Sequence, residues 1–309
     1  MTPEGRSLPN AGVPASAELL RQVRRVEMRT RRLVNSRFSG EYLSTFKGQG
    51  IEFAEVREYL PGDDIRAIDW NVTARLGKPF VKRYIEEREL SVLMIADLSG
   101  SDRWGTRGKL KSWLLTEVVA TLAMSAVRNN DRVGLLVVTD RVERFLPPRK
   151  GRRHVLRMIR DLLSFKADHS TTNLTSAMDY ARRVLAHRSL VFVFSDFQLG
   201  DGWDAFGNAI SGLRARHDVV ACHLVDPSDR ELPDVGMLRT VDPETGEVVF
   251  LDTTSPEVRE RHAALAARDE GEAQRLFHRV GIDEIRLRTD ESFASALISF
   301  FRRRERRRR

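Results

Sequence analysis

The stretch Ser91-Val-Leu-Met-Ile-Ala-Asp97-Leu-Ser99-Gly-Ser101 decides the fold class of this chain. It begins with an apolar run of the length of a buried strand, and a carboxylate and two hydroxyls follow directly. Similar apolar runs alternate with amphipathic segments along the chain, which is typical of an α/β domain with a largely parallel sheet. The predicted strands are 91–96, 133–139, 190–194, 219–225 and 282–287, with an antiparallel edge strand at 144–146. The predicted helices are 109–127, 152–163, 174–186, 203–214, 256–280 and 292–302.

Oxygen-bearing side chains cluster where these strands end. Asp97, Ser99 and Ser101 follow the first strand, Asp196 follows a later one, and Thr172 lies in the loop ahead of a predicted helix. In an open α/β sheet, ligands bind beyond the carboxyl ends of the strands, so three loops are expected to converge there. Carboxylates and hydroxyls form the hard oxygen donor set that Mg²⁺ prefers. The D-x-S-x-S pattern alone is weak evidence, because Asp and Ser are also common in turns and helix caps.

The remaining segments define the expected domain organisation. Residues 1–15 are expected to be disordered, and residues 16–88 to form an amphipathic helix followed by a small β-rich module. The main domain is expected to span 89–302, with a β-hairpin inserted near 238–252 and a basic tail at 303–309. Cys222 lies in an apolar run and is expected to be a core residue.

The three converging loops resemble the metal-ion-dependent adhesion site of the von Willebrand factor A family. That site combines D-x-S-x-S, a threonine ahead of a helix and an aspartate at a strand end. By this resemblance, Ser99 and Ser101 coordinate Mg²⁺ directly, with Mn²⁺ or Ca²⁺ as alternatives. Thr172 would bind directly or through water, and Asp97 and Asp196 largely through water. One coordination position would stay open for a carboxylate of a partner protein.

A second resemblance, to the bacterial family called domain of unknown function 58, is more specific. It rests on Gly48-Gln-Gly-Ile-Glu-Phe53, Arg57-Glu-Tyr59, Pro61-Gly-Asp-Asp64, Arg66, Ile68-Asp-Trp70 and Thr73-Ala-Arg75. It implies that the β-rich module is joined to a doubly wound, mostly parallel sheet with helices on both faces. The family's genes usually lie beside those of MoxR-type AAA+ ATPases. The resemblance therefore implies such an ATPase, or its client, as the partner in a chaperone-like or assembly role.

Composition narrows the cellular setting. No apolar run approaches the roughly 20 residues of a spanning helix, and the mean hydropathy is −0.38, so a cytoplasmic location is expected. The formal net charge is +8, and residues 302–309 carry +6 of it. A solvated end is the simpler interpretation of this basic tail. Transient contact with an acidic membrane is an alternative, and binding to nucleic acid is less favoured.

Enzymatic functions are less favoured. The chain lacks the G-x-x-x-x-G-K-[ST] phosphate-binding loop and the H-E-x-x-H zinc motif. A metal-dependent hydrolase with Asp63, Asp64 or Asp69 as the base is the alternative. These acids alternate closely with arginines, so a structural network around a turn explains them better, with Trp70 as a core anchor beneath it. The sequence therefore predicts a non-catalytic, Mg²⁺-dependent protein-binding adaptor.

Overall fold

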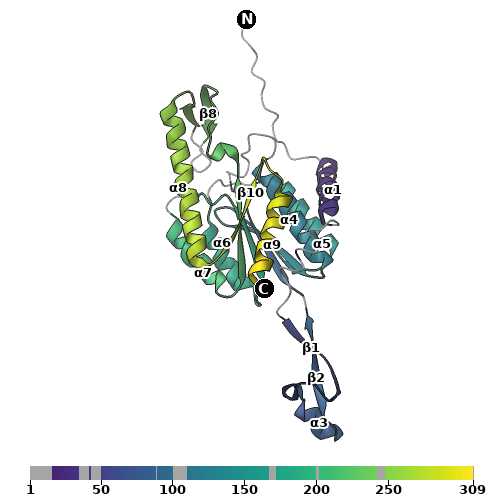
Figure 1. Ribbon diagram of the computed structural model, residues 1–309. Helices are drawn as coiled ribbons and strands as arrows, with labels where there is room; N and C mark the ends of the chain where they lie inside the picture. The colour runs from purple at the N-terminus through teal and green to yellow at the C-terminus, as the bar shows by residue number, and fades with distance from the viewer. Residues whose placement is uncertain are drawn as a thin grey trace. The chain divides into compact units, whose positions relative to one another are not determined.

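The computed structural model describes residues 16–34, 42, 50–87, 89–99, 110–166, 172–199, 202–241 and 248–308. The chain forms two compact units (Figure 1). The larger unit comprises Met1–Thr45 and Ser91–Arg309, and the smaller comprises Phe46–Leu90. No helix in the described ranges has the length and apolar character needed to cross a membrane.

A six-stranded sheet organises the larger unit, in the order β10-β7-β6-β3-β4-β5. The strands are β3 (Ser91–Asp97), β4 (Arg132–Val138), β5 (Val142–Arg149), β6 (Leu190–Ser195), β7 (Asp218–Val225) and β10 (Asp283–Arg288). All neighbours are parallel except β5, which runs antiparallel to β4. The predicted α/β fold is confirmed, and the expected edge strand is longer than the predicted 144–146.

The strand order places a topological switch point between β3 and β6. The chain leaves β3 towards β4 on one side and leaves β6 towards β7 on the other. The connections therefore diverge at the carboxyl ends of β3 and β6, which is the topological switch point where open α/β sheets bind ligands.

Helices cover both faces of this sheet (Figure 1). They are α4 (Lys111–Arg128), α5 (Arg152–Ser164), α6 (Leu174–Val184), α7 (Trp203–Arg214), α8 (Pro256–Val280) and α9 (Phe293–Arg308). On one face, α6, α7 and α8 share a buried core with the strands, to which Ile95, Val193 and Phe277 contribute. On the other face lie α4, α5 and α9. The expected hairpin is formed by β8 (Met237–Val241) and β9 (Val248–Asp252), which pair antiparallel.

The N-terminal helix α1 (Ser16–Leu33) differs from the predicted organisation, because it belongs to the larger unit and not to the β-rich module. Its apolar side chains Val23 and Val26 are buried. Arg29 donates to Glu117 of α4 at 2.8 Å, and Glu27 accepts from Arg152 of α5. The predicted unit 16–88 is therefore divided, because burial of an apolar helix face outweighs proximity in the chain.

The C-terminal helix α9 also differs from the prediction. The expected helix ends at 302, whereas the structure continues it to Arg308. Arg304 forms an ion pair with Asp218, and Arg307 with Asp283 at 3.0 Å. Residues 303–308 are therefore helical, and part of the basic tail is held against the sheet.

The smaller unit is a β-hairpin with short helices inserted in its connection. Strand β1 (Gly50–Glu58) pairs antiparallel with β2 (Phe80–Glu87), and η2 (Ile65–Ala67) and α3 (Trp70–Leu76) lie between them. Asp69 caps α3 by accepting from the main chain of Asn71 and Val72. The expectation that Trp70 is a core anchor is wrong. It is the first residue of α3, and 67% of it is exposed.

Candidate metal centre

Two adjacent strand ends position the core of the predicted site. Ala96 of β3 is aligned with Phe194 of β6, so Asp97 and Ser195 follow side by side at the carboxyl ends of the strands. Asp97 is 1% exposed, and the hydroxyl of Ser195 donates to its Oδ2 at 2.7 Å. The backbone N–H of Ser99 donates to Asp97 Oδ1 at 3.1 Å. The carboxylate is therefore held from two sides at the switch point of the sheet.

Thr172 reaches this point from a loop that is separately anchored. Thr172 Oγ1 donates to Ser99 Oγ at 2.7 Å, which joins two of the predicted metal ligands. The next residue, Asn173, donates its backbone N–H to the carbonyl of Thr139 at 2.8 Å. The side chain of Asn173 also caps α6 by accepting from Ser176 N at 3.0 Å. Thr172 is thus fixed between the end of β4 and the start of α6.

The structure brings some of the predicted metal ligands together and does not describe all of them. Asp97, Ser99 and Thr172 are brought together by the hydrogen bonds above. Asp196 follows β6 and lies close enough for its carboxylate to affect Asp97 electrostatically. Ser101 lies outside the described residues, so its placement stays a prediction.

The electrostatics of Asp97 are those of a carboxylate with no cationic partner in the described part of the chain. Burial and, after it, the nearby Asp196 carboxylate raise the pKa of Asp97 to about 7, although the hydrogen bonds from Ser195 and Ser99 act to lower it. Opposite charge within a few ångströms would favour the ionised form. A bound cation would therefore remove an electrostatic cost that the protein residues leave in place.

Lys111 is a member of this site that sequence reasoning missed. It is the first residue of α4, and only 1% of it is exposed. Its Nζ lies 3.1 Å from Asp196 Oδ2 and 3.0 Å from Asp229 Oδ1. Burial disfavours the ammonium, but the two carboxylates outweigh burial and raise the pKa of Lys111 above its ordinary value. The sequence contained one signal, because Lys111 shares helical spacing with the buried Leu114, Leu115 and Val118.

The donor set fits a weakly held, hydrated Mg²⁺ ion and not an all-carboxylate cage. Within the described ranges, no three His, Cys, Asp or Glu side chains are grouped to hold a metal. The site instead offers the hydroxyls of Ser99 and Thr172 beside the Asp97 carboxylate. Mg²⁺ commonly keeps several waters and binds few protein ligands, so this set suits it. Lys111 already neutralises part of the charge of Asp196, which further limits affinity for a metal.

The acids considered for a hydrolase have local structural partners. Arg57 donates to both carboxylate oxygens of Asp63, at 2.8 and 2.7 Å. Asp64 caps η2 by accepting from Arg66 N at 2.9 Å, and Asp69 caps α3. These contacts agree with the structural network predicted around the turn.

This chain is similar in sequence to a known protein family. The family described as "Protein of unknown function DUF58" matches residues 55–272. The chain belongs to the DUF58 family. An uncharacterized protein of Mycobacterium tuberculosis is 31% identical over 291 residues, which cover 94% of this chain and 90% of that relative. The uncharacterized protein YeaD of Bacillus subtilis is 27% identical over 109 residues, covering 35% of this chain and 25% of YeaD.

Solved structures with some similarity to this DUF58 chain include BatB from Bacteroides thetaiotaomicron and the VWA domain of SpRpn10. BatB is 16% identical, with a TM-score of 0.44, and the match covers 70% of this chain and 99% of BatB. The SpRpn10 domain is 8% identical, with a TM-score of 0.41, over 68% of this chain and 94% of that domain. These values support no transfer of function.

Proposed function

We propose that this DUF58 protein is a non-catalytic adaptor that captures a carboxylate of a partner protein through Mg²⁺ held at the carboxyl ends of β3 and β6. The observation that carries the proposal is the convergence of Ser99 and Thr172 on the buried Asp97 carboxylate, which has no cationic partner among the residues that the structure describes. Mn²⁺ or Ca²⁺ could replace Mg²⁺, because all three favour oxygen ligands.

The residues have separate roles in this proposal. Ser99 and Thr172, together with Ser101, would supply hydroxyl oxygens to the metal. Asp97 and Asp196 would hold water ligands and orient the hydroxyls, as residues around a metal commonly do. A partner carboxylate would complete the coordination sphere, and the metal would then bridge two proteins.

The kind of partner is proposed from the resemblance to the family. A MoxR-type AAA+ ATPase, or a client of one, is proposed in a chaperone-like or assembly role in the cytoplasm. Hydrolysis by the chain itself is the less favoured alternative, because Asp63, Asp64 and Asp69 already serve in an ion pair and two helix caps.

The first test measures metal binding directly. Titration calorimetry with MgCl₂ is run on the full chain and on Asp97→Ala, with Asp204→Ala as a control. Asp204 is an exposed aspartate in the first turn of α7. Asp97→Ala is expected to lower Mg²⁺ affinity by about 10- to 100-fold, the range seen for residues that support a metal. Equal affinity in all three proteins would refute the site.

The second test addresses the partner. The same three proteins are used to capture partners from native lysate, with Mg²⁺ or with EDTA. An AAA+ ATPase retained by the wild type and Asp204→Ala in Mg²⁺, and lost with EDTA or Asp97→Ala, would support the metal bridge. If the ATPase is retained both with EDTA and by Asp97→Ala, the metal bridge is refuted.

A further inference from the structure

The outer edge of β10 is a candidate interaction surface that the metal site does not use. β10 ends the sheet, and β7 is the strand that pairs with it. Among the described residues, no other strand pairs with β10. Exposed edge strands present main-chain donors and acceptors that can pair with another chain. Two strands, β7 and β6, separate this edge from β3 and the metal centre.

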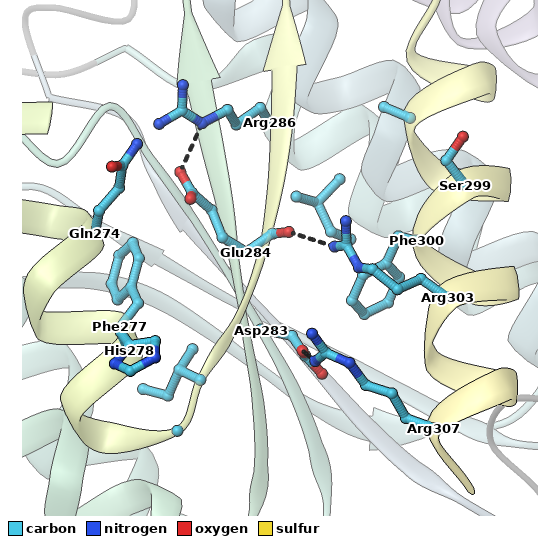
Figure 2. A pocket seen from close by; sticks show the side chains of 14 residues that line it. Gln274, Phe277, His278, Asp283, Glu284, Arg286, Ser299, Phe300, Arg303 and Arg307 are labelled. Carbon is cyan, nitrogen blue, oxygen red and sulfur yellow. Dashed lines mark hydrogen bonds and ion pairs between the residues drawn. The ribbon is translucent and has the colours of Figure 1, made fainter. Parts of the chain in front are cut away.

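Two hydrogen bonds show which main-chain groups of β10 face the outer edge of the sheet. Thr289 N donates to the carbonyl of Val225, which ends β7, at 3.1 Å. Arg303 Nη2 donates to the carbonyl of Glu284 at 3.4 Å from the opposite side (Figure 2). In a strand, main-chain groups of alternate residues point to alternate edges. The N–H and C=O of Glu284 and Arg286 therefore face the outer edge.

Two helices turn this edge into a groove. A cavity of about 720 Å³ lies along β10, with Gln274, Phe277 and His278 of α8 on one wall. The other wall is α9, from which Phe300 and Arg303 line the groove (Figure 2). A strand added to the sheet would lie about 4.8 Å from β10, between these helices.

The α9 wall has an excess of positive charge. Arg302, Arg303, Arg306 and Arg307 line an adjoining cavity of about 530 Å³. Arg307 is paired with Asp283 at 3.0 Å, whereas Arg303 donates to a neutral carbonyl, that of Glu284. Within the described ranges, Arg306 is exposed and forms no ion pair. Residues three and four apart share a helix face, so these charges form one stripe beside the edge.

We infer that the outer edge of β10 binds an acidic, extended segment of a partner protein, which joins the sheet as an additional strand. Main-chain hydrogen bonds to Glu284 and Arg286 would give affinity, as in other β-strand additions. Successive side chains of an added strand point to opposite faces, so acidic residues at every second position would meet the arginines of α9. A nucleic acid could pair its phosphates with the arginines, but it has no peptide main chain to hydrogen-bond to the edge of β10.

The binding test uses two matched peptides with the full chain. The probes are fluorescein-labelled eight-residue peptides that alternate Glu with Thr or Lys with Thr, followed by anisotropy. The Glu peptide is expected to bind and the Lys peptide to fail. Arg303→Glu and Arg306→Glu are each expected to weaken binding by about tenfold, a 1.4 kcal/mol change. Arg153→Glu, an exposed arginine of α5, should change nothing. Failure of the Glu peptide to bind, or equal binding of both peptides, would overturn the inference.

A second pair of variants isolates the main chain. Arg286→Ala and Arg286→Pro both remove the side chain, but only proline also removes the outward N–H. Arg286→Pro is therefore expected to bind the Glu peptide about tenfold more weakly than Arg286→Ala. Equal binding would overturn strand addition. If Arg286→Pro does not fold, hydrogen exchange on the wild type decides, because the peptide should protect the segment 283–288.

The variant Asp97→Ala distinguishes a failure of the proposed metal site from a failure of the proposed β10 binding edge. Asp97→Ala should bind the Glu peptide as the wild type does, with or without EDTA. Loss of peptide binding in Asp97→Ala, with the fold intact, would overturn the assignment to the β10 edge. A single-stranded oligonucleotide that binds more tightly than the Glu peptide would also overturn it.

Discussion

Asp63 in the smaller unit and Asp97 in the larger unit are both aspartates held by hydrogen bonds, yet their pKa values move in opposite directions. Arg57 donates two bonds to Asp63 and lowers the pKa of that half-buried carboxyl, with help from Leu60 N. Asp97 receives bonds from Ser195 and Ser99 but is buried, and its pKa rises to about 7. Hydrogen bonds alone do not decide the charge state. The cationic partner and exposure do, which separates a structural turn from a candidate binding site.

Asp196 shows the intermediate case within the larger unit. It is as buried as a core residue, with 7% exposed, but it has the ammonium of Lys111 at 3.1 Å. Among the described residues, the site therefore contains one carboxylate with an internal cation, Asp196, and one without, Asp97. The charge of Asp196 is therefore compensated by Lys111 without a metal, whereas a bound cation would stabilise the ionised form of Asp97.

The largest expected effect comes from removing the internal cation. Lys111→Met keeps an unbranched side chain of similar length but leaves the Asp196 and Asp229 carboxylates without the ammonium. Breaking a buried pair from one side typically costs about 3–5 kcal/mol, so a loss of that order in the free energy of unfolding is expected. Urea denaturation at neutral pH with EDTA measures it.

A matched lysine provides the control for this prediction. Lys78 pairs with Glu58 at 3.2 Å but is 68% exposed at its side chain. Lys78→Met should cost about 0–1 kcal/mol, as exposed ion pairs do. Similar losses for the two variants would mean that Lys111 is not the buried cation described above. Added Mg²⁺ is expected to recover part of the loss in Lys111→Met alone.

The pH dependence of stability should be of intermediate size. Because the pKa of Asp97 is raised from 3.8 to about 7, the native state binds a proton more tightly than the unfolded state between these values. The free energy of unfolding therefore falls as pH rises through this window, by up to about 1.4 kcal/mol per pH unit. Asp97→Asn should remove this contribution. Parallel pH curves for the wild type and Asp97→Asn in EDTA would contradict the assignment.

The smallest effect is expected in the smaller unit. Asp63→Asn removes the charge that pairs with Arg57, and solvent partly screens that half-buried pair. The lowered pKa of Asp63 gives stability that is present above its ordinary pKa and lost as pH falls through the folded value, the reverse of Asp97. A small decrease in Tm at neutral pH and unchanged Mg²⁺ affinity are expected. Loss of Mg²⁺ binding in Asp63→Asn would abolish the contrast between the two aspartates.

Much of the architecture could be predicted from local patterns. Each of the five predicted parallel strands forms a strand. Four of them, β3, β4, β6 and β7, are apolar runs that need burial on both faces, whereas β10 alternates buried and more exposed residues. Asp97 and Asp196 were identified because a polar residue directly after such a run must emerge at the end of the sheet. The errors at Trp70 and at residues 303–308 share one cause. Neither the exposure of a side chain nor the ionic partner of an arginine is encoded in neighbouring residues.

The sequence by itself determined the order of strands and helices and the oxygen-bearing residues at the strand ends, since periodicity and residue type are local properties of the chain. Only the tertiary structure decided which strands are neighbours, and therefore that β3 lies beside β6 and that β10 is an edge. It also decided that α1 packs on the larger unit and that Lys111 neutralises Asp196, 85 residues away. These features depend on packing across long separations, where burial and charge pairing act between segments that no local pattern connects.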